Sequence, residues 1–374
     1  MSQRLPLAPG VLLLVCLTAC STPRPAQEDG PSPFVFRRLD LKQQDPSGRP
    51  SWELSSPEAR YDLGRHLARA VDPKGLIYRD GKPLYRVRAG TGIVINDGEV
   101  IQLEGGIRLQ RLGSDPVVLR ASRARWLPSR QLIELDRHPE ARDSHTRLRS
   151  DTARLLIDRD RLELRGRPTL QQRVRATDPR VPLPAGRPQI EVKVVSLDWG
   201  PRSGRLEARG PVLARRDSRL EARSPKDEPP LDLAARSLSG NTLQQRLNLE
   251  GPVRITQAPA TAMQAGSVAL DLATSLASGE GGCRIQRAED TLSASRCSWN
   301  WRSQDISAQG DVVLRRGRPA QWTRGSQLVG RLGDDGHVTL SAPGSRVISQ
   351  YRLPPSRQTP RPQPRRSKPE PIRL

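Results

Sequence analysis

The chain has few of the residues that usually build a large hydrophobic core. Its 374 residues include only 2 Phe and 4 Tyr, and aromatic residues make up 3% of the total. It is instead rich in turn formers, with 35 Pro and 30 Gly. After the first twenty residues, no stretch sustains the 3.6-residue apolar period of a helix. These absences argue against a helical fold and favour many short strands joined by turns.

The chain also lacks the motifs of a common enzyme site. It has no His-Glu-x-x-His metal motif, no Gly-x-Ser-x-Gly nucleophile turn and no Gly-Lys-Ser/Thr phosphate loop. Acidic pairs such as Asp158 and Asp160 lie in turns, where such residues ordinarily form the turn itself. We therefore expect no enzyme, no metal site and no cofactor. The four histidines lie far apart along the chain, at His66, His138, His145 and His337.

Lysine is scarce, although the chain is strongly basic. Only six of the 62 basic residues are Lys, and the formal net charge is +22. Such a charge favours a nucleic-acid surface or an anionic lipid surface. Alternatively, arginine scattered over nearly every polar position reflects a GC-rich genome. No basic stretch alternates with stacking aromatics, so we expect no nucleic-acid partner.

Only one long apolar run occurs, Val11–Leu17, and it is too short to span a bilayer. It fits the hydrophobic region of a secretory signal. The run ends in Leu17-Thr18-Ala19-Cys20, which resembles a bacterial lipobox and implies lipidation of Cys20. The alternative is an ordinary signal peptide with a chance cysteine. We predict a signal peptide at 1–19 and a Pro-rich tether at 20–33.

One pattern recurs eight times along the rest of the chain. Each unit opens with an apolar residue. Small or apolar residues follow two, five and seven residues after it, and a residue that is usually glycine follows eighteen residues after it. We call these the second, fifth, seventh and eighteenth places of the unit. The units begin at Leu54, Val87, Leu119, Leu148, Val192, Leu233, Met263 and Leu292. Glycine fills six of the eight eighteenth places, so the repeat is not accidental. These places are Asp72, Gly105, Arg137, Gly166, Gly210, Gly251, Gly281 and Gly310.

Each unit predicts two strands joined by a turn. Alternation over about five residues, as in Leu162-Glu163-Leu164, directs one side of each strand inward. The first residue and the second place lie on one face of a regular strand, whereas the fifth and seventh places lie on the other. If all of them are to point inward, the first strand needs a bulge or bend. Glycine at the eighteenth place would let the second strand turn a corner. Polar turns such as Asn96-Asp97-Gly98 separate the strands.

The spacing between units lengthens twice, at two Pro-rich segments. The first segment, Asp178–Pro188, predicts a domain boundary, and the second, Ser224–Pro230, predicts a long loop. The Pro- and Arg-rich carboxyl terminus predicts disorder. The resulting divisions are a first β-domain at 34–177, a linker at 178–190, a second β-domain at 191–353 and a disordered tail at 354–374.

Two cysteines lie within the last unit and fit a disulfide. If the turn between them centres on Asp290, Cys283 and Cys297 oppose each other across a hairpin, with Ile285 facing Ser295. The alternative is a pair of buried free thiols. Export from the cytosol would permit the disulfide. No other nearby cysteine could complete a metal site.

Three of the six tryptophans occupy the same seventh place of the repeat. Trp126, Trp199 and Trp299 could stack on sugars, but their shared position favours packing in the core.

The repeat is similar to the OstA/LptA-type repeat of lipopolysaccharide transport. The similar pattern is Leu-x-Ala-x-x-Ala-x-Trp/Leu, followed after ten residues by Gly-x-Val-x-Leu. Trp52-Glu53-Leu54, followed by Ala59 and Tyr61, looks most like LptC. LptC is the membrane-anchored periplasmic component of the lipopolysaccharide exporter. The resemblance covers roughly residues 34 to 350.

This resemblance implies an all-β fold of two tandem, open, twisted β-jellyrolls. Acyl chains of lipopolysaccharide would lie in a slit between two sheets, with the sugars outside. The implied partners are lipopolysaccharide, the permease subunits of an inner-membrane ABC transporter, and other OstA-like bridge proteins that pair through strand edges. The candidate slit residues are the inward aliphatic side chains Leu103, Ile107, Leu109, Leu119, Ile133, Leu135, Leu155, Leu162 and Leu164.

Two departures from the LptC pattern are visible. A typical LptC has about half this length, one jellyroll and a transmembrane helix, whereas this chain has two predicted jellyrolls and a lipobox. We expect anchoring at the periplasmic face of the inner membrane, with outer-membrane anchoring as the alternative. A second hypothesis is a structural envelope lipoprotein that assembles through β-edges and binds no lipid.

Overall fold

The computed structural model describes residues 34–114, 116–172, 189–217, 229–317, 321–332 and 336–351. In these ranges the chain forms β-strands, turns and two short 3-10 turns, η1 (Asn96–Gly98) and η2 (Pro128–Arg130), with no α-helix. The predicted all-β class is confirmed. The signal peptide, the tether and the carboxyl-terminal tail lie outside the described residues.

Antiparallel pairing arranges the strands in two long ladders that share the longest strands. The first ladder, here the first sheet, runs in the order β1 (Phe34–Phe36), β4 (Glu58–Asp62), β5 (Leu67–Val71), β8 (Thr91–Ile95), β9 (Val100–Arg111), β10 (Val118–Leu127), β11 (Leu132–Asp136), β14 (Thr152–Leu156), β15 (Arg161–Arg165), β18 (Ser196–Trp199), β19 (Arg205–Arg216), β20 (Leu231–Asn241), β21 (Arg246–Gln257), β22 (Thr261–Asp271), β23 (Leu276–Glu280), β26 (Arg296–Asn300), β27 (Asp305–Arg316), β28 (Gln321–Arg331) and β29 (Val338–Ser341).

The second ladder, here the second sheet, uses the other short strands and the other halves of the shared long ones. Its order is β2 (Leu39–Gln44), β3 (Pro50–Ser56), β6 (Lys74–Arg79), β7 (Lys82–Arg88), β9, β10, β12 (Glu140–Arg142), β13 (Thr146–Arg149), β16 (Thr169–Gln172), β17 (Ile190–Lys193), β19, β20, β21, β22, β24 (Cys283–Arg287), β25 (Asp290–Ala294), β27, β28 and β30 (Ile348–Tyr351).

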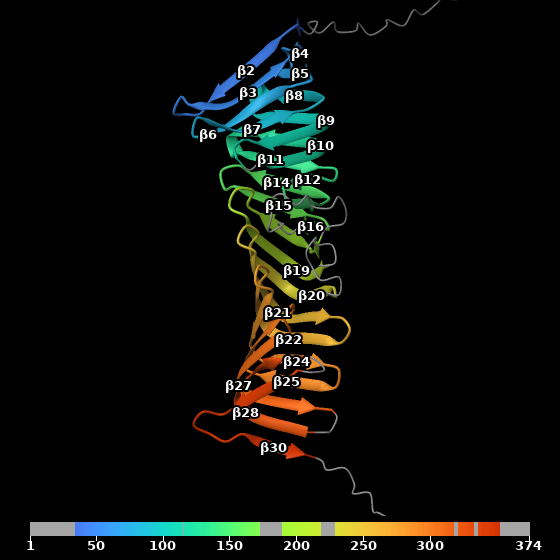
Figure 1. The fold of residues 1–374 in the computed structure, drawn as a ribbon. Helices are drawn as coiled ribbons and strands as arrows, with labels where there is room; N and C mark the ends of the chain where they lie inside the picture. Colours follow the sequence, from blue (N-terminus) through green and yellow to red (C-terminus); the bar gives the residue numbers. More distant parts are fainter. Residues whose placement is uncertain are drawn as a thin grey trace, which may run out of the picture.

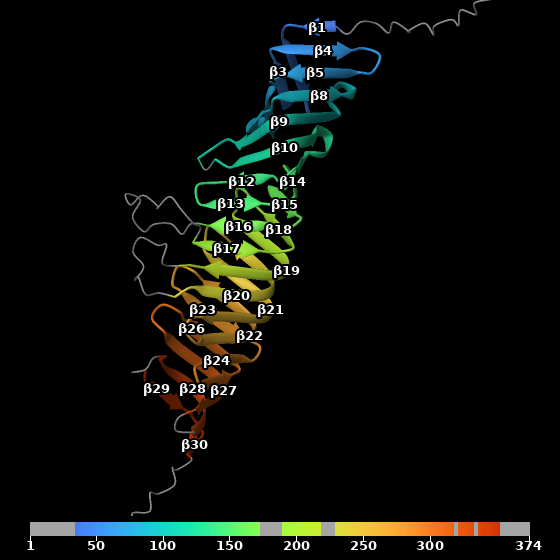
Figure 2. The same ribbon diagram turned by 90° about the vertical axis from the view of Figure 1, so that its right-hand side faces the viewer.

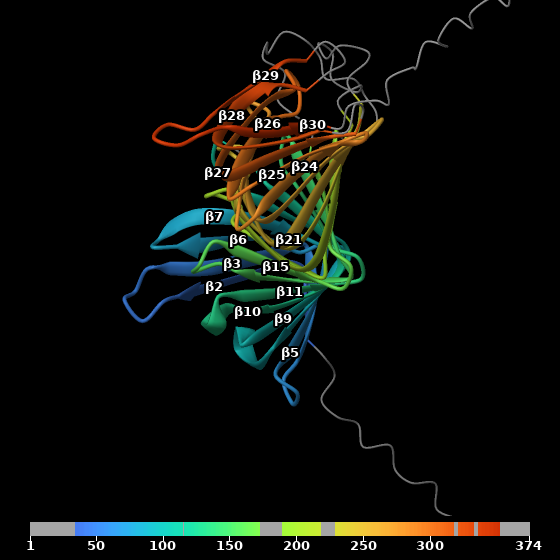
Figure 3. The same ribbon diagram turned by 90° about the horizontal axis from the view of Figure 1, so that it is seen from below.

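The strands form the rungs of an elongated, twisted molecule. Figures 1 and 2 show them stacked along the long axis from β1 and β2 at one end to β30 at the other. Seen along this axis, strands near the two ends cross at an angle (Figure 3). Such a crossing follows from the inherent right-handed twist of β-strands. The two sheets meet along one line, which we call the crease, and enclose the interior between them.

The eighteenth place of each repeat lies at the crease, where a strand passes from one sheet to the other. All eight of these residues have positive φ, including the two that are not glycine, Asp72 (φ 46°) and Arg137 (φ 62°). At Gly210 (φ 90°) an added Cβ would lie 2.6 Å from the Val195 side chain. Both the left-handed backbone and the close contact favour glycine there. The predicted corner is confirmed.

The predicted change of face in the first strand of the unit is also present at the crease. In β10 the register shifts between Ala121 and Arg123, and in β20 it shifts between Ala234 and Ser237. These irregularities let small or apolar residues on both sides of the bend point inward.

Both sheets continue through the predicted domain boundary. Strand β16 pairs with β17, and β15 pairs with β18, although most of the predicted linker lies between them. Ile190, the last residue of that linker, instead begins β17, because it pairs with Gln172 and Arg216 on the neighbouring strands. Residues 173–188 lie outside the described part of the chain. The division into two jellyrolls remains a prediction, but the hydrogen bonding joins both halves.

Candidate functional site

The interior between the sheets is a single column of packed apolar side chains. Buried residues from Trp52 at one end to Leu328 near the other form one connected cluster. The tryptophans of the seventh place belong to it, since Trp126, Trp199 and Trp299 are all buried. Trp126 meets Trp52 edge to face, with ring centroids 5.6 Å apart. Packing in the core, the favoured role for these tryptophans, agrees with this position.

The nine candidate slit residues all lie in this interior. They come from neighbouring strands β9, β10, β11, β14 and β15, and each is at most 1% exposed. Many lie directly opposite one another, as Leu155 does with both Ile133 and Leu162. At these positions the space between the sheets, where the resemblance places the slit, is filled by aliphatic side chains from both sheets. Whether these residues bind lipid stays a prediction.

Opposite the crease, the strand ends and turns of the two sheets approach each other along a line that we call the mouth. Individual polar contacts cross it. The Arg79 guanidinium donates to the Ile157 carbonyl at 3.4 Å, and the Arg111 guanidinium donates to the Pro201 carbonyl at 3.5 Å. Both distances are long for hydrogen bonds, so these contacts close the mouth weakly.

Toward the carboxyl-terminal end, the mouth is held more tightly around Trp301. The Gln257 amide donates to the Trp301 carbonyl at 3.2 Å and accepts from Gln304 at 2.9 Å. The guanidinium of Arg216 lies 5.8 Å from the centre of the Trp301 ring, within the range of a cation–π contact. The repeat did not single out Trp301, because it lies in a turn beyond the seventh place.

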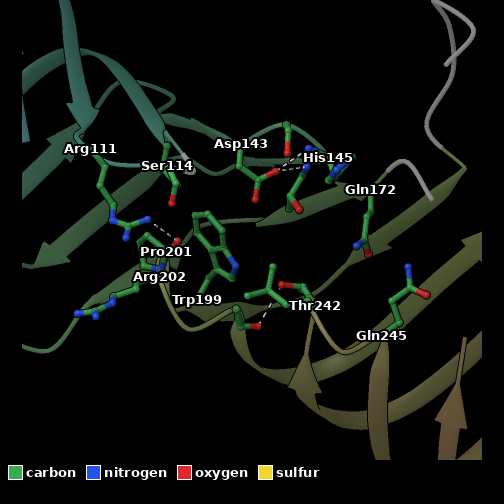
Figure 4. Close-up of a pocket in the computed structure, with 15 residues that line it drawn as sticks. Arg111, Ser114, Asp143, His145, Gln172, Trp199, Pro201, Arg202, Thr242 and Gln245 are labelled. Carbon is green, nitrogen blue, oxygen red and sulfur yellow. Dashed lines mark hydrogen bonds between the residues drawn. The ribbon is translucent and has the colours of Figure 1, made fainter. Parts of the chain in front are cut away.

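A cavity of about 300 Å³ opens at the mouth near the middle of the molecule. Figure 4 shows Trp199 at its centre, with Arg111 and Asp143 on one side and Arg202 and Thr242 on the other. The Trp199 indole N–H is buried and has no hydrogen-bond partner. The cavity thus places the Trp199 ring and arginine side chains beside the apolar interior. No motif in the sequence pointed to Arg111 or Arg202, since arginine fills so many turns.

A buried phenol lies close to the charged groups of the mouth. Tyr85 on β7 is 2% exposed. Burial raises the pKa of Tyr85 far above its usual value, and the nearby Asp160 carboxylate raises it further. Arg111 and Arg79 oppose this effect by favouring the phenolate. The phenol is therefore neutral at physiological pH.

The comparison with known families bears on this architecture. Residues 11–169 match the family model described as "Lipopolysaccharide-assembly, LptC-related". The match begins in the apolar run near the amino terminus and ends at the first residue of β16, so it covers less than half of the chain.

One solved structure with similarity to this chain is "LptH, the LptA homologous periplasmic component of the conserved lipopolysaccharide transport device from Pseudomonas aeruginosa". The sequences are 15% identical, the TM-score is 0.31, and the alignment covers 34% of this chain and 100% of that one. A search of curated protein sequences finds no significant match.

Both ends of the described molecule present open strand edges. Within the described residues, β1 and β2 pair on one side only at the amino-terminal end, and β29 and β30 do so at the other. The first edge exposes Phe34, Val35 and Phe36 at 53%, 60% and 42%. The last exposes Ile348 and Tyr351 at 53% and 61%. Apolar edges of this kind are templates for strand addition.

Cys283 and Cys297 form a disulfide, with their Cα atoms 5.8 Å apart. The predicted hairpin register is wrong, because Cys283 lies opposite Ala294 and Ile285 lies opposite Leu292. The turn falls before Asp290, and the chain then crosses the crease at Ser295. Cys297 consequently lies in the first sheet, so the disulfide joins the two sheets.

The proposed lipidation site, Cys20, lies outside the described residues. Within the described ranges, no helical segment has the length and hydropathy needed to cross a bilayer.

Proposed function

We propose that this chain is a lipid-anchored periplasmic component of lipopolysaccharide export. It holds acyl chains between its two sheets and passes them to neighbouring bridge proteins. The observation that carries this proposal is the uninterrupted apolar column from Trp52 to Leu328, in a chain whose amino-terminal part is LptC-like. A long apolar interior with open strand edges at both ends suits a track for lipid tails.

Entry of a lipid requires the sheets to separate at the mouth. The closing contacts at Arg79 and Arg111 are long, whereas the sheets are covalently continuous at the crease. Opening at the mouth therefore breaks only these long hydrogen bonds, whereas opening at the crease would require the continuous strands to separate. The cavity around Trp199 offers a polar place for a headgroup while acyl chains displace or separate the aliphatic side chains below.

Anchoring at Cys20 and assembly through the ends complete the proposal. The chain would be held at the periplasmic face of the inner membrane, near the permease subunits of the ABC transporter. The exposed strand β1 at one end and β30 at the other would pair with OstA-like bridge proteins. Palmitate labelling that disappears in Cys20→Ala would support the anchor, and labelling that persists in this variant would exclude it.

Photo-crosslinking in living cells tests the lipid-binding interior. A photoreactive residue at Leu103, Ile133 or Leu164 should capture lipopolysaccharide, because these side chains point inward. The matched outward controls are Glu104, which forms an ion pair with Arg123 at 2.9 Å, and Glu134. Equal labelling of inward and outward positions would show that the interior does not hold the lipid.

A second function is favoured by one observation, the filled interior. A structural envelope lipoprotein that assembles through its β-edges would need no lipid between the sheets. Native mass spectra of the purified protein mixed with lipopolysaccharide separate the two functions. Bound lipopolysaccharide supports transport, whereas partner complexes without any lipid support the structural role.

A further inference from the structure

The outer face of the second sheet carries a row of like charges. Lys74 on β6 lies directly opposite Arg88 on β7, Arg88 lies opposite Arg108 on β9, and Arg108 lies opposite Arg120 on β10. Directly opposed residues on adjacent strands lie about 4.5–5.5 Å apart, and like charges in such pairs are destabilising. We call these four residues the cationic row.

Two more arginines extend this surface, and its charges are not neutralised. Arg86 and Arg142 lie beside the cationic row, and none of the six residues forms an ion pair with a described carboxylate. The adjacent carboxylate of Glu140 is already occupied by Arg149 at 2.9 Å and Arg147 at 3.5 Å. The six cations are therefore available to an external anion.

The same cations line two shallow hollows. The first has a volume of about 420 Å³, and its charged lining consists of Arg108, Arg120, Arg142, Glu140 and Asp143. Glu140 is paired as described above, and the Asp143 carboxylate accepts from the backbone N–H groups of His145 and Thr146. The second has a volume of about 380 Å³, and its charged lining consists of Lys42, Lys74, Arg86, Arg88, Asp40 and Glu53. Cations outnumber carboxylates in the second hollow.

The neighbouring part of the first sheet, from β10 to β15, is organised differently. On its outer face Arg125 lies opposite Glu134, Glu134 opposite Arg154, and Arg154 opposite Glu163. Arg154 is 4.0 Å from Glu134 and 3.8 Å from Glu163. Arginine-rich composition alone would affect both faces alike, so it does not account for the unneutralised row on one face.

We infer that the outer face of the second sheet, from β6 to β12, docks on an anionic phospholipid surface. The face is broad, and lysine and arginine side chains bind anionic headgroups without requiring a fixed partner shape. The inference rests on the proposed function for its choice of partner. A chain anchored at Cys20 keeps Phe34 within about 50 Å of the membrane, since 14 extended residues reach no further.

The cationic row lies near the amino-terminal end of the described chain, which is the end that follows the predicted tether in the sequence. Strands near the carboxyl-terminal end cross those of the amino-terminal end at an angle, so the outer face of the second sheet points in another direction there (Figure 3).

Vesicle flotation tests this inference. The whole mature chain, with Cys20→Ser to prevent lipidation, is mixed with phosphatidylcholine vesicles that contain or lack phosphatidylglycerol. We expect binding only to the anionic vesicles and its loss in high salt, because exposed charges are then screened. The triple variant Arg88→Gln, Arg108→Gln, Arg120→Gln should bind roughly a hundredfold more weakly. The matched control Arg125→Gln, Arg154→Gln should bind within about twofold of the parent.

The thermal midpoint shows whether the variants fold. The triple variant should be at least as stable as the parent, because its changes relieve like-charge repulsion. Equal binding to both vesicle types, or full binding by the triple variant, would overturn the inference. So would capture of soluble lipopolysaccharide or an acidic protein by this face without vesicle binding. Phosphatidylglycerol binding needs neither lipopolysaccharide nor the anchor, so this result is independent of the interior crosslinks.

Discussion

At the scale of single residues, the crease depends on backbone conformations that few side chains tolerate. Gly210 and Gly310 have φ values of 90° and 76°, and an added Cβ would meet the side chains of Val195 and Ser295. Asp72 and Arg137 adopt the same left-handed conformation without glycine. The bend is therefore imposed by the two-sheet architecture, and glycine relieves its strain.

Gly210→Ala should lower the free energy of unfolding by about 1–3 kcal/mol, because it adds both backbone strain and a clash with Val195. Gly106→Ala is the matched control, since Gly106 also has positive φ but has open space around its Cβ position. Urea denaturation of the two variants separates the clash from the strain. Equal losses in both would mean that the contact with Val195 is unimportant.

The raised pKa of Tyr85 predicts that the free energy of unfolding falls at alkaline pH. Its pKa is raised above the unfolded value of about 10, so its stabilising contribution is complete below that pH and is lost as pH rises through the folded value. Tyr85→Phe should flatten the fall in unfolding free energy above about pH 10. An unchanged fall above about pH 10 in Tyr85→Phe would refute this assignment.

At the scale of elements, the longest strands, such as β9 and β10, bend at the crease and belong to both sheets, whereas each short strand belongs to one sheet. Register shifts such as that between Ala121 and Arg123 keep apolar residues inward on both sides of the bend. Because the longest strands contribute to both walls of the interior, separation of the sheets requires movement at the mouth and not at the crease.

The disulfide between β24 and β26 should stabilise this arrangement near the carboxyl-terminal end. The two cysteines are separated by 14 residues, and closure of a loop of that length contributes about 3 kcal/mol. Denaturation with and without reductant measures the loss. The double variant Cys283→Ser, Cys297→Ser should have the stability of the reduced protein and be insensitive to reductant. A reductant effect that persists in this variant would require another explanation.

At the scale of the whole molecule, a packed apolar column runs between two ends that present open strand edges. Photoreactive residues at Val35 should capture a neighbouring bridge protein, because this edge strand lacks a partner on its outer side. Leu63, which is 50% exposed but lies in a turn between paired strands, is the matched control. Capture from Leu63 alone would place the contact away from the strand edge.

The local sequence determined the all-β class, the repeat and its corners. Alternating residues such as Leu162 and Leu164 specify a strand with one buried side, and glycine at positions such as Gly166 marks positive φ, because both signals act within a few residues. The interior location of all nine aliphatic candidates followed from the same alternation.

Only the tertiary structure decided what depends on packing and on register between strands. The closed interior arises because side chains from both sheets fill it, which the pattern of one strand does not encode. The alignment of Arg88 with Arg108, and of Cys283 with Ala294, is set by bends and turn lengths. One residue of shift moves a side chain to the opposite face, so local sequence could not predict the cationic row or the position of the disulfide.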